Sequence, residues 1–268
     1  MPVVAANGLE IGYDVVGAGP PAVWLHGATS LGADDFAAQL PLFSKSFRIY
    51  LPDARGHGRT RWDGAAGFQH GWLADDLAAF VDAVGLHTFH LLGFSMGGMT
   101  ALQYAARSST RLRTLVVAGI SPEREPRASV GAKSMDVATI LATDPAWAKV
   151  LGRRHDAGQG VDGWQRLLPA IAADIAVHPL LEAHDLHGID VPTLVVCGDS
   201  DPWVPVDHAL ELRRQIPQAS LFVAPDSGHV VMVRRPGLFN EALGVFYRAT
   251  EAQARARTAA GSIEGGPE

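Results

Sequence analysis

The stretch from Phe89 to Gly98 reads Phe-His-Leu-Leu-Gly-Phe-Ser-Met-Gly-Gly and decides the fold of this chain. Its apolar first half predicts a buried strand, and the residues that follow predict a helix. Glycines 93 and 97 flank Ser95 in the pattern Gly-x-Ser-x-Gly, which forms a tight turn between a strand and a helix. Such a turn exposes the serine hydroxyl where helix N-terminal amides favour negative charge. We therefore predict that Ser95 is a catalytic nucleophile.

Strand and helix patterns alternate on both sides of this turn. Short apolar runs predict strands at residues 3–5, 9–16, 22–25, 47–51, 88–92, 114–118, 193–197 and 220–224. Helical periodicity lies between them at 72–84, 98–107, 206–215 and 236–249. Continuous rather than alternating hydrophobicity is typical of strands that are buried on both faces. The sequence therefore predicts an α/β protein with a mostly parallel sheet of about eight strands and helices on both faces.

One long interval interrupts this alternation. About 70 residues without a strand pattern separate Gly119 from Thr193, which is too long for a plain loop. Apolar residues between Trp164 and Ile175 recur at helical spacing. We expect residues 122–187 to form a helical insertion over one edge of the sheet, broken at 156–160. Residues 1–121 and 188–250 then form the core, and residues 251–268 are expected to be a disordered tail.

A serine hydroxyl becomes a strong nucleophile only beside a base that is itself oriented by an acid. His229 follows the predicted strand at 220–224, and both Asp199 and Asp201 follow the strand at 193–197. The loop at 119–121, after the preceding strand, offers no carboxylate. Because parallel strands end at one edge of the sheet, where open α/β sheets place their sites, we expect His229 and one aspartate beside Ser95.

The oxyanion that forms during attack on a carbonyl needs backbone N–H donors. Met96 provides one because it directly follows the nucleophile, and Ala28 provides the other from the loop after the strand at 22–25. Larger side chains in the site loops and the insertion are candidates for the substrate pocket. An apolar pocket would favour acyl groups or rings over charged substrates, although each tryptophan could equally pack in the interior. The candidates are Met99, Trp147, Trp164 and Trp203.

The loop at residues 52–60 combines Asp53, Arg55 and His57 with glycines, a mixture that could indicate catalysis. We interpret it instead as structural. Charge-assisted hydrogen bonds of Asp53 and Arg55 are expected to hold this loop beneath the site.

Composition narrows the class of protein. Twenty-eight acidic residues against 22 basic ones give a net charge of −6, which does not favour a nucleic-acid partner. Cys197 is the single cysteine and lies in a predicted buried strand, and no Cys/His set has metal-ligand spacing. We therefore expect no metal and no cofactor. Without a membrane-spanning run or a signal peptide pattern, we expect a cytoplasmic protein that acts on a small molecule.

Five motifs, in this order, resemble the α/β-hydrolase superfamily over about residues 1–250. They are His26-Gly27, Asp53-x-Arg55-Gly56-x-Gly58, Gly93-x-Ser95-Met96-Gly97-Gly98, Gly198-x-x-Asp201-x-x-x-Pro205 and Gly228-His229. The resemblance implies an α/β-hydrolase fold in which the insertion is the cap. It implies that Ser95 is the nucleophile, His229 the base and Asp201, rather than Asp199, the acid.

The chain looks most like small capped serine esterases, enol-lactonases and carbon–carbon bond hydrolases. We therefore expect a serine hydrolase that cleaves a carboxylic ester or lactone through an acyl-enzyme. Alternatives are a carbon–carbon bond hydrolase of a dienoic diketone, a perhydrolase-like enzyme, or a ligand-binding protein with this fold. Serine at position 95 excludes relatives that use aspartate there. The choice between monomer and homodimer stays open.

Overall fold

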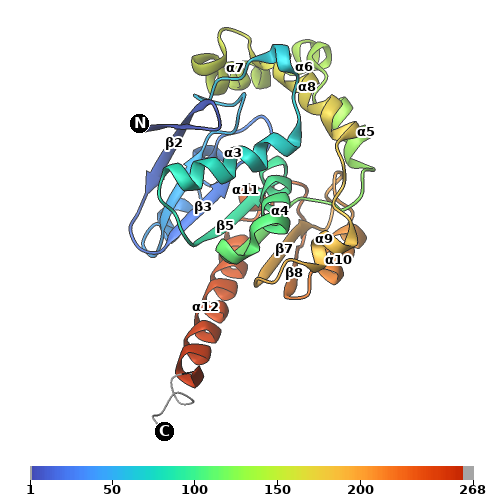
Figure 1. The fold of residues 1–268 in the computed structure, drawn as a ribbon. Coiled ribbons are helices and arrows are strands. Elements are labelled where there is room, and N and C mark those ends of the chain that lie inside the picture. The colour runs from blue at the N-terminus through green and yellow to red at the C-terminus, as the bar shows by residue number, and fades with distance from the viewer. Residues whose placement is uncertain (1, 262–268) are drawn as a thin grey trace.

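The sheet has eight strands in the order β1-β2-β4-β3-β5-β6-β7-β8 (Figure 1). The computed structural model describes residues 2–261. In it β2 pairs antiparallel with β1 and β4, while β3 to β8 run parallel, so the predicted α/β-hydrolase architecture is confirmed. Every predicted strand lies within two residues of an observed one. The strands are β1 (Val3–Ala6), β2 (Leu9–Val16), β3 (Pro21–Leu25), β4 (Arg48–Pro52), β5 (Phe89–Phe94), β6 (Leu112–Ala118), β7 (Thr193–Gly198) and β8 (Ala219–Ala224).

Helices cover both faces of the sheet, and each face has its own apolar layer. On one face α3 (His70–Ala83), α4 (Met96–Ser108) and α10 (Val206–Gln215) bury residues such as Phe80 against Val23. On the other face α1 (Gly32–Asp35), α2 (Leu40–Phe43), α11 (Val231–Arg234) and α12 (Pro236–Gly261) bury residues such as Phe239 near Trp24. Successive strand residues point to opposite faces, and both faces are apolar, which explains the continuous hydrophobic runs.

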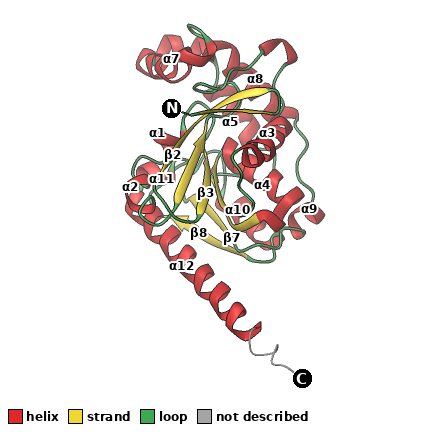
Figure 2. Cartoon of the chain, turned by 60° about the vertical axis from the view of Figure 1, so that its left-hand side comes forward, coloured by secondary structure: helices red, strands yellow, loops and turns green. Residues whose placement is uncertain are grey.

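Four helices of the insertion lie together beyond one end of the sheet (Figure 2). They are α5 (Arg127–Ser134), α6 (Val137–Thr143), α7 (Pro145–Gln159) and α8 (Trp164–Val177). Leu151, Trp164 and Leu167 form the apolar interior of this cap. The expected break at 156–160 is not present, because α7 continues through Gln159 and ends at Gly160. The fifth helix, α9 (Ala183–His187), packs against α4 and α10, so it joins the core.

The C-terminal helix α12 extends well past the sheet, on the side away from the cap (Figures 1 and 2). It continues to Gly261, so the prediction of a disordered tail is wrong for residues 251–261. Alanine and arginine make up most of this segment, and both favour helix, so the helix that starts at Pro236 continues without a break. Residues 262–268 of the predicted tail lie outside the described residues. Within 2–261, no helix is long and apolar enough to span a membrane.

Candidate active site

Ser95 occupies the sharp turn between β5 and α4. Its backbone has φ 51° and ψ −114°, an arrangement that costs a non-glycine residue on the order of 1–3 kcal/mol. The turn is held by a hydrogen bond of 2.8 Å from the Ser95 N–H to the carbonyl oxygen of Ala118 on the neighbouring strand. Side chains at Gly93 or Gly97 would collide with the backbone of Gly97 and Leu25 respectively. Both glycines are therefore required for this turn.

His229 links Ser95 to a buried carboxylate. Its Nε2 atom lies 2.9 Å from the Oγ atom of Ser95, and its Nδ1 atom lies 2.8 Å from Oδ2 of Asp201. The Asp201 side chain is fully buried, and its Oδ1 atom accepts hydrogen bonds from the N–H groups of Trp203 and Val204. This network fixes the carboxylate against the imidazole. The arrangement can move a proton from a serine hydroxyl to an imidazole that is oriented by an acid.

Asp199, the competing aspartate, faces elsewhere. Its two carboxylate oxygens accept hydrogen bonds from the backbone N–H groups of Ser227, at 3.1 Å, and Asp226, at 3.0 Å. These hydrogen bonds, that of Ser227 first, lower the pKa of the Asp199 carboxyl. Asp199 therefore shapes the loop that carries His229, while Asp201 contacts the imidazole itself.

The loop after β3 brings Ala28 to the same pocket as Ser95, Met96 and His229. Two hydrogen bonds hold it there. The Gly27 N–H donates to a carboxylate oxygen of Asp35 at 2.8 Å, and the Gly97 N–H donates to the carbonyl oxygen of His26 at 3.1 Å. The N–H groups of Ala28 and Met96 have no acceptor among the hydrogen bonds of residues 2–261. Both are therefore free to bind an oxyanion at the pocket wall.

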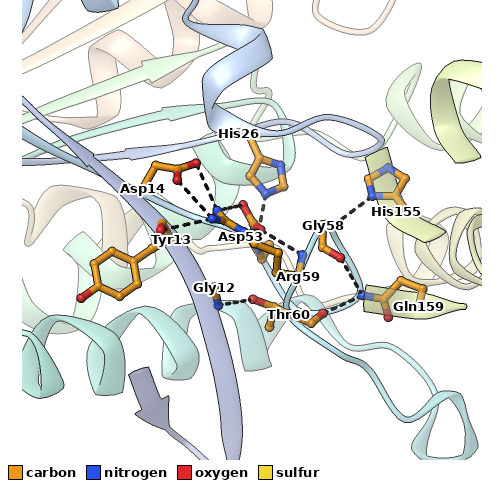
Figure 3. Close-up of polar contacts among 11 residues, drawn as sticks. Gly12, Tyr13, Asp14, His26, Asp53, Gly58, Arg59, Thr60, His155 and Gln159 are labelled. Atoms are coloured by element: carbon orange, nitrogen blue, oxygen red, sulfur yellow. Dashed lines mark hydrogen bonds and ion pairs between the residues drawn. The ribbon is translucent and has the colours of Figure 1, made fainter. Parts of the chain in front are cut away.

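The loop at 52–60 is held by charge-assisted hydrogen bonds of Asp53 and Arg55, as predicted. Arg55 binds both carboxylate oxygens of Asp76 on α3, each at 2.6 Å. Asp53 pairs at 2.6 Å with Arg59, which also reaches Asp14 on β2 (Figure 3). The hydrogen bonds to Asp53 raise the pKa of the Arg59 guanidinium, so this pair remains charged.

Two side chains of α7 tie the cap to this loop (Figure 3). The Gly58 N–H donates to the Nδ1 atom of His155 at 3.1 Å, and the Gln159 amide donates to the carbonyl oxygen of Thr60 at 2.8 Å. Gln159 lies inside the segment 156–160 that was expected to be a flexible break, and His155 directly precedes it. The cap is therefore fixed to the core at this side.

The pocket beside Ser95 contains about 450 Å³ of space free of protein atoms, including its mouth. Of the four candidates for this pocket, Met99 and Trp203 line it. The prediction is wrong for Trp147 and Trp164, which pack in the cap instead. Trp164 shares a helix face with Leu167 and is only 1% exposed, and Trp147 lies beneath the guanidinium of Arg154.

Three polar side chains of the pocket escaped the sequence analysis. His70 begins α3, Arg127 begins α5 and His178 follows α8, so they are far apart in the chain and belong to no common motif. Only the packing of the cap on the core brings them together. No group of three or more His, Cys, Asp or Glu residues suited to a metal ion occurs within residues 2–261.

The fold and the site together define an α/β-hydrolase, and comparison with known proteins places the chain in that family. The profile of the Alpha/beta hydrolase family matches residues 22–242. The chain therefore belongs to this family.

Three similar proteins represent its relatives. The chain is 31% identical to Serine hydrolase BPHL of Mus musculus, over 88% of this chain and 82% of that protein. It is 27% identical to the pimeloyl-[acyl-carrier protein] methyl ester esterase of Aeromonas hydrophila subsp. hydrophila, over 89% of this chain and 99% of that protein. The solved structure of Est816, described as an N-acyl homoserine lactone degrading enzyme, has a TM-score of 0.74 at 27% identity. The match covers 91% of this chain and 100% of the Est816 chain.

Proposed function

We propose that this protein is a serine hydrolase that cleaves a carboxylic ester or a lactone through an acyl-enzyme. In this proposal Ser95 is the nucleophile, His229 the general base and Asp201 the acid that orients it. The observation that carries the proposal is the continuous chain of contacts from Ser95 Oγ through the imidazole to the buried carboxylate, at 2.9 and 2.8 Å. Both distances are within hydrogen-bond reach, as general base catalysis requires.

Acylation begins when Nε2 of His229 takes the proton of the Ser95 hydroxyl as Oγ attacks the carbonyl carbon. The negative oxygen of the tetrahedral intermediate accepts hydrogen bonds from the N–H groups of Ala28 and Met96. Asp201 accepts a hydrogen bond from Nδ1–H and stabilises the positive imidazolium. The proton on Nε2 then passes to the leaving alkoxide, or to the ring oxygen of a lactone, as the carbon–oxygen bond breaks.

Deacylation repeats these steps with water. His229 takes a proton from the water molecule as its oxygen attacks the acyl carbon. The same two N–H groups bind the second oxyanion, and the proton returns to the Oγ atom of Ser95 as the ester bond to the enzyme breaks. Product acid leaves, and the three side chains return to their starting protonation states.

We propose an ester or a lactone as the substrate because similar proteins act on such compounds. One of them is an esterase of a methyl ester, and another degrades a lactone. Both reactions release an oxygen leaving group from an acyl carbon, which is the chemistry that this site can assist. We keep carbon–carbon bond hydrolysis, perhydrolysis and ligand binding without catalysis as outcomes of the test below.

The test combines labelling with substrate comparison. A fluorophosphonate probe is expected to modify wild-type protein at Ser95 and to leave the Ser95→Ala variant unlabelled. p-Nitrophenyl esters, lactones and a vinylogous diketone are then offered in parallel, and Ser95→Ala is expected to lose turnover while retaining its circular dichroism spectrum. Faster turnover of the diketone would indicate carbon–carbon bond hydrolysis. Failure of the probe to label folded wild-type protein would indicate a binding protein.

A further inference from the structure

The pocket beside Ser95 has one cationic wall, formed where the cap meets the core. Arg127 lines it from the first turn of α5 and is only 8% exposed. Its Nη2 atom lies 3.3 Å from Nε2 of His178. Its Nε atom is buried and has no hydrogen-bond partner within residues 2–261. A buried guanidinium N–H without an acceptor costs free energy. A ligand that accepts a hydrogen bond from this N–H would remove that cost, since no group within residues 2–261 does so.

The neighbouring carboxylate of Asp174 forms no ion pair with this arginine. Asp174 accepts a hydrogen bond from the backbone N–H of His70 at 3.2 Å, and its other oxygen lies 3.5 Å from Nδ1 of His178. Among the ion pairs within residues 2–261, none joins Arg127 to a carboxylate. Arg124 adds a second positive charge, and its guanidinium donates to the backbone carbonyls of Ile175 and His178. Arg127 is therefore close to a second guanidinium, that of Arg124, and to the single carboxylate of Asp174.

The groups around Arg127 leave it charged. Burial and the nearby charge of Arg124 lower the pKa of Arg127 to about 10, which still lies well above neutral pH. Burial lowers the pKa of His70 to about 3, so that imidazole is uncharged and adds no cation of its own. The wall thus presents one desolvated positive charge to the pocket. A desolvated charge gains most from an oppositely charged group that also accepts its hydrogen bonds.

We propose that Arg127 is a specificity-determining residue that binds a carboxylate of the substrate, so that the preferred ester or lactone carries a second, ionised carboxyl group. This inference rests on the proposed hydrolase function for the reaction at Ser95. The sequence alone favoured acyl groups or rings over charged substrates, because the pocket candidates Met99, Trp147, Trp164 and Trp203 are apolar.

A carboxylate fits this wall better than a phosphate group. The Nε–H of the guanidinium has no acceptor, and the neighbouring Nη2 group has two N–H donors, of which the contact with His178 uses one. This edge of the guanidinium matches the two oxygens of a carboxylate. Beyond Arg127 and His178, the cap side of the pocket is lined by the apolar residues Met135, Ile171 and Ile175. A phosphate dianion needs more donors than one arginine supplies. The apolar stretch suits the carbon chain that joins the carboxylate to the reacting carbonyl.

The test compares two esters that share the number of acyl carbons and the leaving group. p-Nitrophenyl hexanoate is neutral, and mono-p-nitrophenyl adipate ends in a carboxylate; half-esters from succinate to suberate set the best length. Wild-type protein is expected to favour the acidic ester in kcat/KM. Arg127→Met is expected to lower the ratio of acidic to neutral kcat/KM by about 10- to 100-fold, as expected for the loss of a hydrogen bond to a charged group.

Two further variants guard against a purely structural explanation. Arg127→Lys keeps the charge without the fork and is expected to retain an intermediate ratio. Arg153→Gln removes an exposed arginine of α7 that does not line the pocket, and it is expected to keep the wild-type ratio. Thermal unfolding shows whether each variant is folded. Equal losses for both esters in folded Arg127→Met, with the ratio unchanged, would overturn the proposal.

Binding measurements separate this inference from the proposed reaction. Calorimetry on the Ser95→Ala variant measures affinity for both esters without turnover. Tighter binding of the acidic ester, lost when Arg127→Met is added, supports the carboxylate site even if wild-type protein hydrolyses neither ester, in which case only the proposed reaction fails. Equal binding of both esters by Ser95→Ala, together with normal wild-type hydrolysis of both, would overturn the carboxylate site and leave the hydrolase intact.

Discussion

The indole of Trp203 stacks on the imidazole of His229, with ring centroids 5.2 Å apart and an interplanar angle of 21°. Phe94 covers the ring from another direction, with centroids 5.1 Å apart. The imidazole that is proposed to transfer the proton is thus enclosed by aromatic rings as well as by Asp201. Because aromatic faces attract cations, the stacked indole stabilises the imidazolium that forms during each half of the proposed reaction.

Replacing the indole tests this contribution. Trp203→Leu is expected to lower kcat by about 5- to 30-fold, the range that corresponds to loss of a desolvated cation–π contact. The hydrogen bond from the backbone N–H of residue 203 to Asp201 does not depend on the side chain, so the carboxylate stays in place. Trp147→Leu is the matched control, because Trp147 packs in the cap outside the pocket. Similar kcat losses in both variants would contradict the stacking role.

We expect opposite effects on activity from substitution of the two aspartates after β7. Asp201→Asn is expected to lower kcat by a factor on the order of 10⁴, since an amide at this position favours the wrong imidazole tautomer. Asp199→Asn is expected to retain most of the activity and lose some stability, because its carboxylate accepts the backbone N–H groups of Ser227 and Asp226. Steady-state kinetics and thermal unfolding of both variants provide the comparison. A larger kinetic loss in Asp199→Asn would assign the acid role to that residue.

The strained backbone of Ser95 predicts that glycine there is more stable than alanine. Ser95→Gly and Ser95→Ala both remove the hydroxyl, and both are expected to lose activity. Only glycine adopts φ 51° and ψ −114° without strain, so we expect Ser95→Gly to be about 1 kcal/mol more stable than Ser95→Ala. Urea unfolding measures the difference. A more stable Ser95→Ala would mean that the turn stores little strain.

The sheet and the loops that reach the site could be predicted because their physical causes are local. The run Phe89–Phe94 is mostly apolar and entirely buried, a pattern typical of a short strand that is covered on both faces. The glycines around Ser95 are visible in the sequence as the turn that they permit. Asp201 and His229 follow strands that end at the same edge, so topology alone brings them near the serine.

The sequence predicted the extent of the cap, but it did not predict which side chains of the cap helices face the pocket. Helical periodicity indicated α8, yet the same periodicity does not reveal whether Trp164 faces the pocket or the interior of the cap. Arg127 lay outside every motif because its place in the pocket depends on the packing of α5 against α8, which in turn contacts α3. Helix propensity was also underestimated at the C-terminus, where α12 continues past residue 250 with few contacts to the sheet.

The contact between cap and core through His155 predicts a loss of stability in mild acid. Burial lowers the pKa of His155 to about 4, and its Nδ1 atom must be unprotonated to accept the Gly58 N–H. The unfolded chain binds a proton near pH 6.5, whereas the folded protein does not until about pH 4, so stability falls as the pH drops through this window. Titration of this one group should lower the free energy of unfolding by about 2 kcal/mol between pH 7 and pH 5.

The variant His155→Gln tests this prediction, because its amide oxygen can still accept that N–H but does not titrate. Urea unfolding of the variant at the two pH values should show a loss of stability that is smaller by this amount. Other buried histidines, such as His70, supply the remaining pH dependence in both proteins. An identical loss in wild-type and variant would mean that folding does not lower the pKa of His155, which would contradict this prediction.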